Sequence, residues 1–127
     1  MVVLDTCVII DHLRRREGES ALVSVFKKHR EQRWAVSVVT IQELYEGRST
    51  RSEAGESSLL ATLSLFEVLA YNTEVASLAG KIARDREELM DFADAAIAAT
   101  AVVNEAGLYT LNRKHFQMVP SLELVEL

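Results

Sequence analysis

The chain has 127 residues, of which 49% are hydrophobic and 26% are charged, and its formal net charge at pH 7 is −5. This composition excludes a disordered chain and predicts one folded domain over residues 1–127. The acidic total excludes a generally basic nucleic-acid coat, so contact with a nucleic acid would need local basic residues or bound cations. Cys7 is the only cysteine, which excludes an internal disulfide. Without a long apolar run or a signal peptide, we expect a cytoplasmic protein with no membrane partner.

Two strands and two helices are predicted in the first third of the chain. Residues 2–4 are an apolar run that predicts a buried strand, and residues 6–16 carry apolar side chains at helical spacing. Gly18 ends this helix, and a second amphipathic helix starts at Ser20. The next strand is predicted at residues 34–39, WAVSVV.

The middle of the chain begins with a helix that is predicted from Thr40 to Gly47. Residues 48–58, RSTRSEAGESS, are polar and low in apolar content, which predicts a mobile loop. Residues 59–65 return to a helical pattern, and residues 66–71, FEVLAY, predict a third strand.

The last third is predicted to contain two helices and two short strands. Residues 73–89 form a long amphipathic pattern, and residues 91–104 an alanine-rich helix that Gly107 stops. Strands are predicted at residues 108–111 and 122–125, with Pro120 in a turn between them. Because strands alternate with helices throughout, we expect an α/β fold with three α/β/α layers around a central parallel sheet.

Polar side chains come just after several of the predicted strands. Asp5 ends the first strand, and Glu43 lies in the first turn of the helix that follows the second. Asp94 lies in the first turn of the alanine-rich helix, and Asn112 follows the strand at residues 108–111. Ligands of open parallel sheets bind beyond the carboxyl ends of the strands, so we expect these side chains to converge there.

Helix capping is the alternative explanation for each acid. Thr40 and Glu43 fit a capping box, Asp91 and Asp94 resemble one, and Asp5 could cap the first helix. Three gathered carboxylates, however, would repel one another, which raises their pKa values or requires a cation. Divalent cations such as Mg²⁺ and Mn²⁺ prefer oxygen ligands. A metal site therefore explains the group better than capping does.

Four segments carry a pattern of motifs: VVLDTCVIID (residues 2–11), SVVTIQELYEG (37–47), DFADAAIAATAV (91–102) and LYTLNRKHF (108–116). In this order they resemble the motif regions of PIN-domain ribonucleases, specifically the VapC-type toxins of prokaryotic toxin–antitoxin pairs. The resemblance runs from Val2 to the C-terminus. It is carried most specifically by D-x-x-IAATA followed by T-x-N-x-x-x-F. The implied fold is a single α/β/α PIN domain.

The resemblance implies that Asp5, Glu43 and Asp94 are catalytic acids that hold Mg²⁺ or Mn²⁺. Asn112 falls on the fourth catalytic position, where an amide would hold a second metal more weakly than an acid, so the number of metal ions stays open. The implied activity is that of an endoribonuclease: hydrolysis of RNA phosphodiester bonds that leaves a 5′-phosphate and a 3′-hydroxyl.

Further residues and partners follow from the same resemblance. Thr6 and Thr110 match hydroxyl positions that support the acids or bound water. A cognate VapB-type antitoxin would inhibit the enzyme with an extended tail across the acidic pocket, and a homodimer would use apolar faces of the early helices. Arg14, Arg48 and Arg113 follow motif segments, and we expect them to contact RNA phosphates.

Other functions fit the sequence less well. The retained acids argue against a catalytically weak PIN-fold binding module, and the small chain argues against a metal-dependent DNA or flap nuclease. The spacing of His12 and His115 does not support metal-free acid–base cleavage. A cysteine phosphatase would need an arginine six residues after Cys7, where Leu13 stands. His115 and Asp91 remain candidates for a role at the edge of the site.

Overall fold

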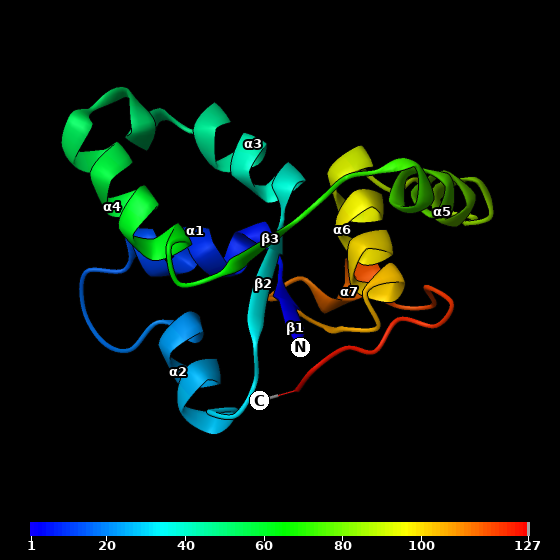
Figure 1. Cartoon of the computed structure of the whole chain (residues 1–127), viewed down its shortest axis with the longest axis horizontal. Coiled ribbons are helices and arrows are strands. Elements are labelled where there is room, and N and C mark those ends of the chain that lie inside the picture. Colours follow the sequence, from blue (N-terminus) through cyan, green and yellow to red (C-terminus); the bar gives the residue numbers. More distant parts are fainter. Residues whose placement is uncertain (127) are drawn as a thin grey trace.

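The computed structural model describes residues 1–126, in which strands and helices alternate (Figure 1). The strands are β1 (Val2–Leu4), β2 (Trp34–Ser37), β3 (Glu67–Leu69) and β4 (Gly107–Tyr109). The α-helices are α1 (Thr6–Arg14), α2 (Ala21–Lys28), α3 (Val38–Glu46), α4 (Glu53–Leu63), α5 (Thr73–Arg84), α6 (Phe92–Val103) and α7 (Arg113–Phe116). A 3₁₀ helix, η1 (Arg48–Arg51), precedes α4.

The strands form one sheet in the order β3-β2-β1-β4, and every neighbouring pair is parallel. In the centre, Val3 of β1 pairs with Ala35 of β2 and Leu108 of β4. The carboxyl ends of all four strands therefore lie at the same edge of the sheet, which is the edge where the sequence placed the acids.

Side chains alternate across the sheet and build a hydrophobic core on each face. Val3, Ala35 and Leu108 belong to the core that α5, α6 and α7 cover. Val2 and Val36 belong to the other core, which is shared with helices α1 to α4. Figure 1 shows these two groups of helices on opposite sides of the strands. The predicted three-layer α/β/α architecture is confirmed.

Helix α6 is buried along most of its length, and every residue from Ala95 to Ala101 is buried. It contacts α5 as well as β1, β2 and β4. Alanine side chains allow this close approach because they add little volume between the backbones. Asp94 directly precedes this buried stretch.

The predicted boundary between the second strand and the next helix is wrong by two residues. β2 ends at Ser37, whose hydroxyl oxygen accepts the N–H of Val39 at 3.1 Å and caps α3. Val38 is therefore already helical, and Thr40 lies inside the helix instead of capping it. The predicted capping box is also wrong, because Glu43 lies in the second turn of α3.

The predicted mobile loop at residues 48–58 is mostly helical. It contains η1 and the first half of α4. Ser52 caps α4 by accepting the N–H of Gly55 at 3.0 Å, and Glu53 and Glu56 in the first turn interact favourably with the helix dipole. Capping residues, and not an apolar pattern, begin this helix.

The C-terminal third differs from the prediction in four respects. Helix α5 ends at Arg84, earlier than predicted (outside this third, α1 also ends early, at Arg14). Gly107 opens β4 instead of stopping α6. The last predicted strand, at residues 122–125, is reduced to a single bridge between Leu108 and Leu124. The short helix α7 was not predicted.

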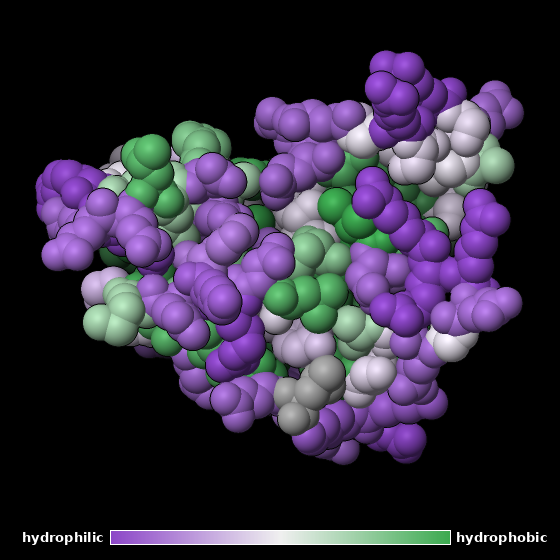
Figure 2. All heavy atoms as spheres, turned by 180° about the vertical axis from the view of Figure 1, so that it is seen from behind, coloured by the Kyte–Doolittle hydropathy of each residue, from purple (hydrophilic) through white to green (hydrophobic). Residues whose placement is uncertain are grey.

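The surface seen from the back is mostly hydrophilic, with smaller hydrophobic areas near its centre (Figure 2). Among the early helices, Val8, Ile9, Leu22 and Val25 are buried in the core, whereas Ile10 and Leu13 of α1 are only partly buried. Within residues 1–126, no helix is long and apolar enough to cross a membrane.

Candidate active site

Asp5 is a buried carboxylate, 4% exposed, at the carboxyl end of β1. Its Oδ1 accepts the N–H of Thr6 at 2.8 Å and so caps α1. Its Oδ2 accepts the hydroxyl of Thr110 at 2.7 Å and the thiol of Cys7 at 3.3 Å. Helix capping therefore accounts for Oδ1 of Asp5, whereas Thr110 and Cys7 orient Oδ2.

Glu43 lies on α3 and is held by the start of α1. The Thr6 hydroxyl donates to Glu43 Oε1 at 2.6 Å, and Thr6 Oγ1 lies 3.0 Å from Thr40 Oγ1. Burial raises the pKa of Glu43, and the charges of Asp5 and Asp94 raise it further, while the Thr6 bond lowers it. Glu43 is thus close enough to the other two acids to be repelled by them.

Asp94 lies in the first turn of α6, as predicted, with a side chain that is 19% exposed. Its Oδ2 is 3.2 Å from Nδ1 of His115 on α7. Burial is the main cause of its raised pKa, and the charge of Asp5 adds to it. Asp91 occupies the cap position of α6 without a side-chain capping bond, so the predicted capping box at this helix is wrong.

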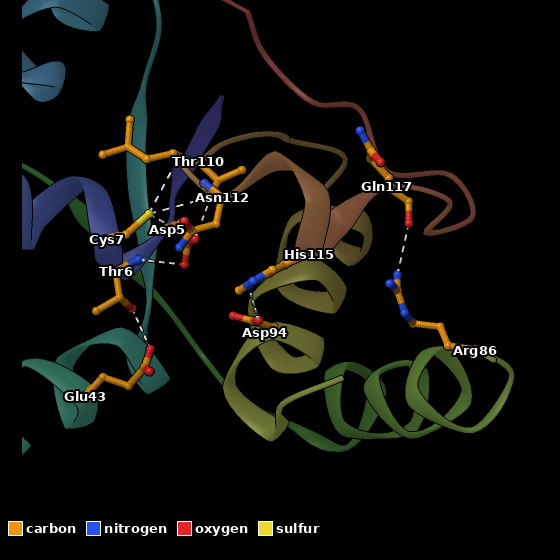
Figure 3. Close-up of polar contacts among 11 residues, drawn as sticks. Asp5, Thr6, Cys7, Glu43, Arg86, Asp94, Thr110, Asn112, His115 and Gln117 are labelled. Carbon is orange, nitrogen blue, oxygen red and sulfur yellow. Dashed lines mark hydrogen bonds and ion pairs between the residues drawn. The ribbon is translucent and has the colours of Figure 1, made fainter. Parts of the chain in front are cut away.

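The carboxylates of Asp5, Glu43 and Asp94 come from three elements and point toward one space (Figure 3). Across residues 1–126, no three His, Cys, Asp or Glu side chains are close enough to form a preassembled metal site. Burial is the main cause of the raised pKa values of Glu43 and Asp94, and repulsion by neighbouring carboxylates raises them further. Their oxygen donors fit a hard divalent cation, which would offset this repulsion.

Asn112 is linked to Asp5 by two consecutive hydrogen bonds through Thr110. Its N–H donates to Thr110 Oγ1 at 2.9 Å, and the Thr110 hydroxyl donates to Asp5. Its exposed side chain stands at the start of α7 and makes no capping bond in the described structure. The structure thus brings Asn112 to the same edge as the acids.

Cys7 is not an activated nucleophile. Burial, together with the charge of Asp5, raises the pKa of its thiol to about 11, so the thiol stays protonated at neutral pH. It donates to Asp5 and accepts the N–H of Leu111 at 3.4 Å. Its contact with the site was missed, although its position two residues after Asp5 could have indicated it. The thiol therefore supports the acid, which argues against the phosphatase alternative.

The candidate RNA-binding arginines have different surroundings. Arg14 and Arg48 line a pocket of about 500 Å³ that also contains Glu43. Arg113 instead donates to the backbone oxygen of Val125 at 3.1 Å and pairs with the following glutamate. The first two arginines are placed beside an acid of the site, and the third is engaged with the C-terminal segment.

Without metal, Glu43→Gln is expected to raise thermal stability at pH 7. The pKa of Glu43 is above its ordinary value of 4.5 in the folded protein, so ionisation costs more in the folded than in the unfolded state. The contribution of Glu43 to the free energy of unfolding is therefore fully present below pH 4.5, and it is lost as the pH rises through the pKa of Glu43 in the folded protein. Melting curves of both proteins in chelator between pH 4 and 8 would measure this. Equal melting temperatures at every pH would contradict it.

Comparisons with known proteins agree with this geometry. The family model for the PIN domain matches residues 2–120. Ribonuclease VapC19 of Mycobacterium tuberculosis is 30% identical, with 97% of this chain and 98% of the relative covered. Ribonuclease VapC1 of Methanocaldococcus jannaschii is 30% identical, covering 97% of this chain and 84% of the relative.

Among solved structures, VapBC2 from Rickettsia felis, bound to a DNA fragment from its promoter, matches with a TM-score of 0.84 and 20% identity. The match covers 99% of this chain and 98% of that one. VapBC-1 from nontypeable Haemophilus influenzae matches with a TM-score of 0.79, 24% identity and coverages of 98% and 96%. The chain therefore belongs to the PIN domain family, and the sequence relatives place it among the VapC ribonucleases.

Proposed function

We propose that the chain is a metal-dependent endoribonuclease whose catalytic acids are Asp5, Glu43 and Asp94. The observation that carries this proposal is that three elements direct these carboxylates toward one space, although the carboxylates repel one another there (Figure 3). The names of the VapC relatives support RNA as the substrate. Residues 1–127 would act as one domain around the single sheet.

The three acids would hold Mg²⁺ or Mn²⁺, with the Asn112 amide as a weaker fourth ligand. The Thr6 bond engages Oε1 of Glu43, and the His115 contact engages Oδ2 of Asp94, so the second oxygen of each is available to a cation. A bound divalent ion supplies charge neutralisation at the phosphate and lowers the pKa of a bound water.

The side chains around the acids fix where those oxygens lie. The Thr110 hydroxyl donates to Oδ2 of Asp5, and the Thr6 hydroxyl donates to Oε1 of Glu43, so each carboxylate is held by a residue of another element. Preoriented ligands lose less entropy when a substrate or ion binds. Hydrolysis of the RNA phosphodiester would leave a 5′-phosphate and a 3′-hydroxyl.

A VapB-type antitoxin would be the inhibitory partner. The structural neighbours include VapBC assemblies and a toxin–antitoxin complex from Klebsiella pneumoniae. The acidic edge and the net charge of −5 suit a basic segment of such a partner. A homodimer is also part of the proposal. Its interface would need side chains outside the core, such as Phe92, which is 71% exposed.

The test is incubation of the purified chain with total RNA in Mg²⁺, in Mn²⁺ and in chelator, followed by mapping of the new ends. We expect internal cuts with 5′-phosphates that depend on the divalent ion. Cleavage in chelator, or binding of RNA without any cleavage in either metal, would contradict the proposal and favour a different nuclease mechanism or a binding module. Preferred cleavage of single-stranded DNA in a parallel reaction would favour the DNA nuclease alternative.

Arg14→Ala and Arg48→Ala are each expected to weaken RNA binding. Removing one phosphate contact reduces the slope of log affinity against log salt concentration by about 1 and raises KM, with kcat little changed. Salt titrations of RNA binding in chelator measure the slope without cleavage. Arg30→Ala, an exposed arginine after α2, is the matched control and should behave as the wild type. An equal loss in this control would show a non-specific charge effect instead.

A further inference from the structure

Each acid of the site has a side-chain partner from another element, and the partner of Asp94 is unlike the others. Asp5 and Glu43 accept hydrogen bonds from threonine hydroxyls at 2.7 and 2.6 Å. Asp94 instead contacts the ring of His115, with 3.2 Å between its Oδ2 and the ring Nδ1 (Figure 3). The contact joins the start of α6 to α7, 21 residues further along the chain.

The contact defines which atom of the ring carries a hydrogen. An ionised carboxylate can only accept, so Nδ1 of His115 must be the donor, whether the ring is neutral or charged. The backbone beneath the ring is fixed as well. Phe116, the next residue, is 1% exposed in the core, and the His115 N–H bonds to the backbone oxygen of Asn112 at 3.0 Å. The donor is therefore presented from an anchored helix.

Asp94 needs such a donor because the charge of Asp5 lies nearby and raises its pKa. A carboxylate without a partner would turn away from that charge, toward solvent. Metal-binding carboxylates in proteins are themselves usually hydrogen-bonded by a second residue, which orients them. We propose that His115 is a positioning residue: its Nδ1–H holds Asp94 in the orientation in which the carboxylate binds a divalent cation.

This inference rests on the proposed function, and direct Mn²⁺ binding separates the two. The amide N–H of Asn can replace Nδ1–H at position 115, whereas that of Gln corresponds to Nε2–H. Electron paramagnetic resonance of free Mn²⁺ would give affinities for the wild type, His115→Ala, His115→Asn and His115→Gln. We expect about 10-fold weaker binding or more for Ala and Gln, the usual cost of losing such a partner. Asn should retain most of the affinity.

A second readout is cleavage of RNA at a Mn²⁺ concentration that saturates only the wild type. We expect a lower kcat for His115→Ala with unchanged KM for RNA, and recovery of kcat in excess Mn²⁺. Urea unfolding would verify that the variant is folded. The matched control is His29→Ala, on a partly buried histidine at the end of α2 whose ring contacts the backbone oxygen of Glu126 instead of an acid of the site.

Unchanged Mn²⁺ affinity in His115→Ala would overturn the inference, and so would rescue by Gln but not by Asn. Nitrogen hyperfine coupling from a directly bound imidazole in the Mn²⁺ spectrum would overturn it too, because His115 would then be a ligand. If the wild type bound no Mn²⁺ at all, the proposed function itself would be wrong, which is a distinguishable result.

Discussion

Asp94→Asn is expected to reduce RNA cleavage by at least about a hundredfold and to leave the fold intact. Loss of a residue that only supports a metal ligand already costs 10- to 100-fold, so loss of a ligand should cost at least the upper value. The folded state should not suffer, because Asp94 makes no helix-capping contribution and its ionisation is unfavourable in the metal-free site. Single-turnover cleavage and urea unfolding would measure the two effects.

The matched control for this variant is Asp91→Asn, three residues earlier on the same helix. Asp91 stands at the cap position of α6 without a side-chain capping bond. The control should cleave RNA at close to the wild-type rate. Near-normal cleavage by Asp94→Asn, or equal losses in both variants, would contradict the assignment of Asp94 as a metal ligand.

Phe116→Ala is expected to lower the free energy of unfolding by about 3–5 kcal/mol, the usual cost of truncating a buried phenylalanine. Phe116 is 1% exposed and anchors α7 in the core shared with α5 and α6. Because α7 also carries His115, the folded fraction of the variant should bind Mn²⁺ more weakly than the wild type. Urea unfolding at pH 7, followed by Mn²⁺ titration below the transition, would measure both effects.

The control for Phe116→Ala is Lys114→Ala on the same short helix. Lys114 is exposed, so its truncation should change the free energy of unfolding by no more than about 0.5 kcal/mol. A loss below 1 kcal/mol for Phe116→Ala would mean that α7 is not held by the core, and the anchoring of His115 would then lose its basis.

The sequence was sufficient for the sheet because its strands are short apolar runs between polar residues. Val2–Leu4 and residues 35–37 are buried on both faces, and such runs are distinctive in a parallel sheet. The rule that strand ends meet at one edge then located Asp5 correctly, while the start of the alanine-rich helix located Asp94. The first-turn position predicted for Asp94 agrees with the structure.

Boundaries set by local hydrogen bonds were harder to predict. Val38 and Val39 have strong strand preferences, but capping by Ser37 places them in a helix. In the same way, capping by Ser52 begins α4 within the polar segment at residues 48–58. Hydrophobic patterns do not report such caps, and the misplaced helix start also misplaced Glu43 by a turn.

The hydrogen bonds that orient the three acids were the least predictable part of the site. The bond from Thr6 to Glu43 joins residues 37 positions apart, and the bond from Thr110 to Asp5 joins residues 105 apart. Only the resemblance to a family suggested those two threonines. Nothing in the sequence paired His115 with Asp94, because that contact depends on the unpredicted helix α7.

The most direct measurement is an anomalous difference map at the manganese edge from crystals of the protein soaked in Mn²⁺. We expect one strong peak in the space faced by Asp5, Glu43 and Asp94, with a carboxylate oxygen of each at coordinating distance. A peak bound elsewhere would contradict the metal-centred mechanism. So would a well-ordered site that holds no ion, with these carboxylates apart, at Mn²⁺ concentrations that support RNA cleavage.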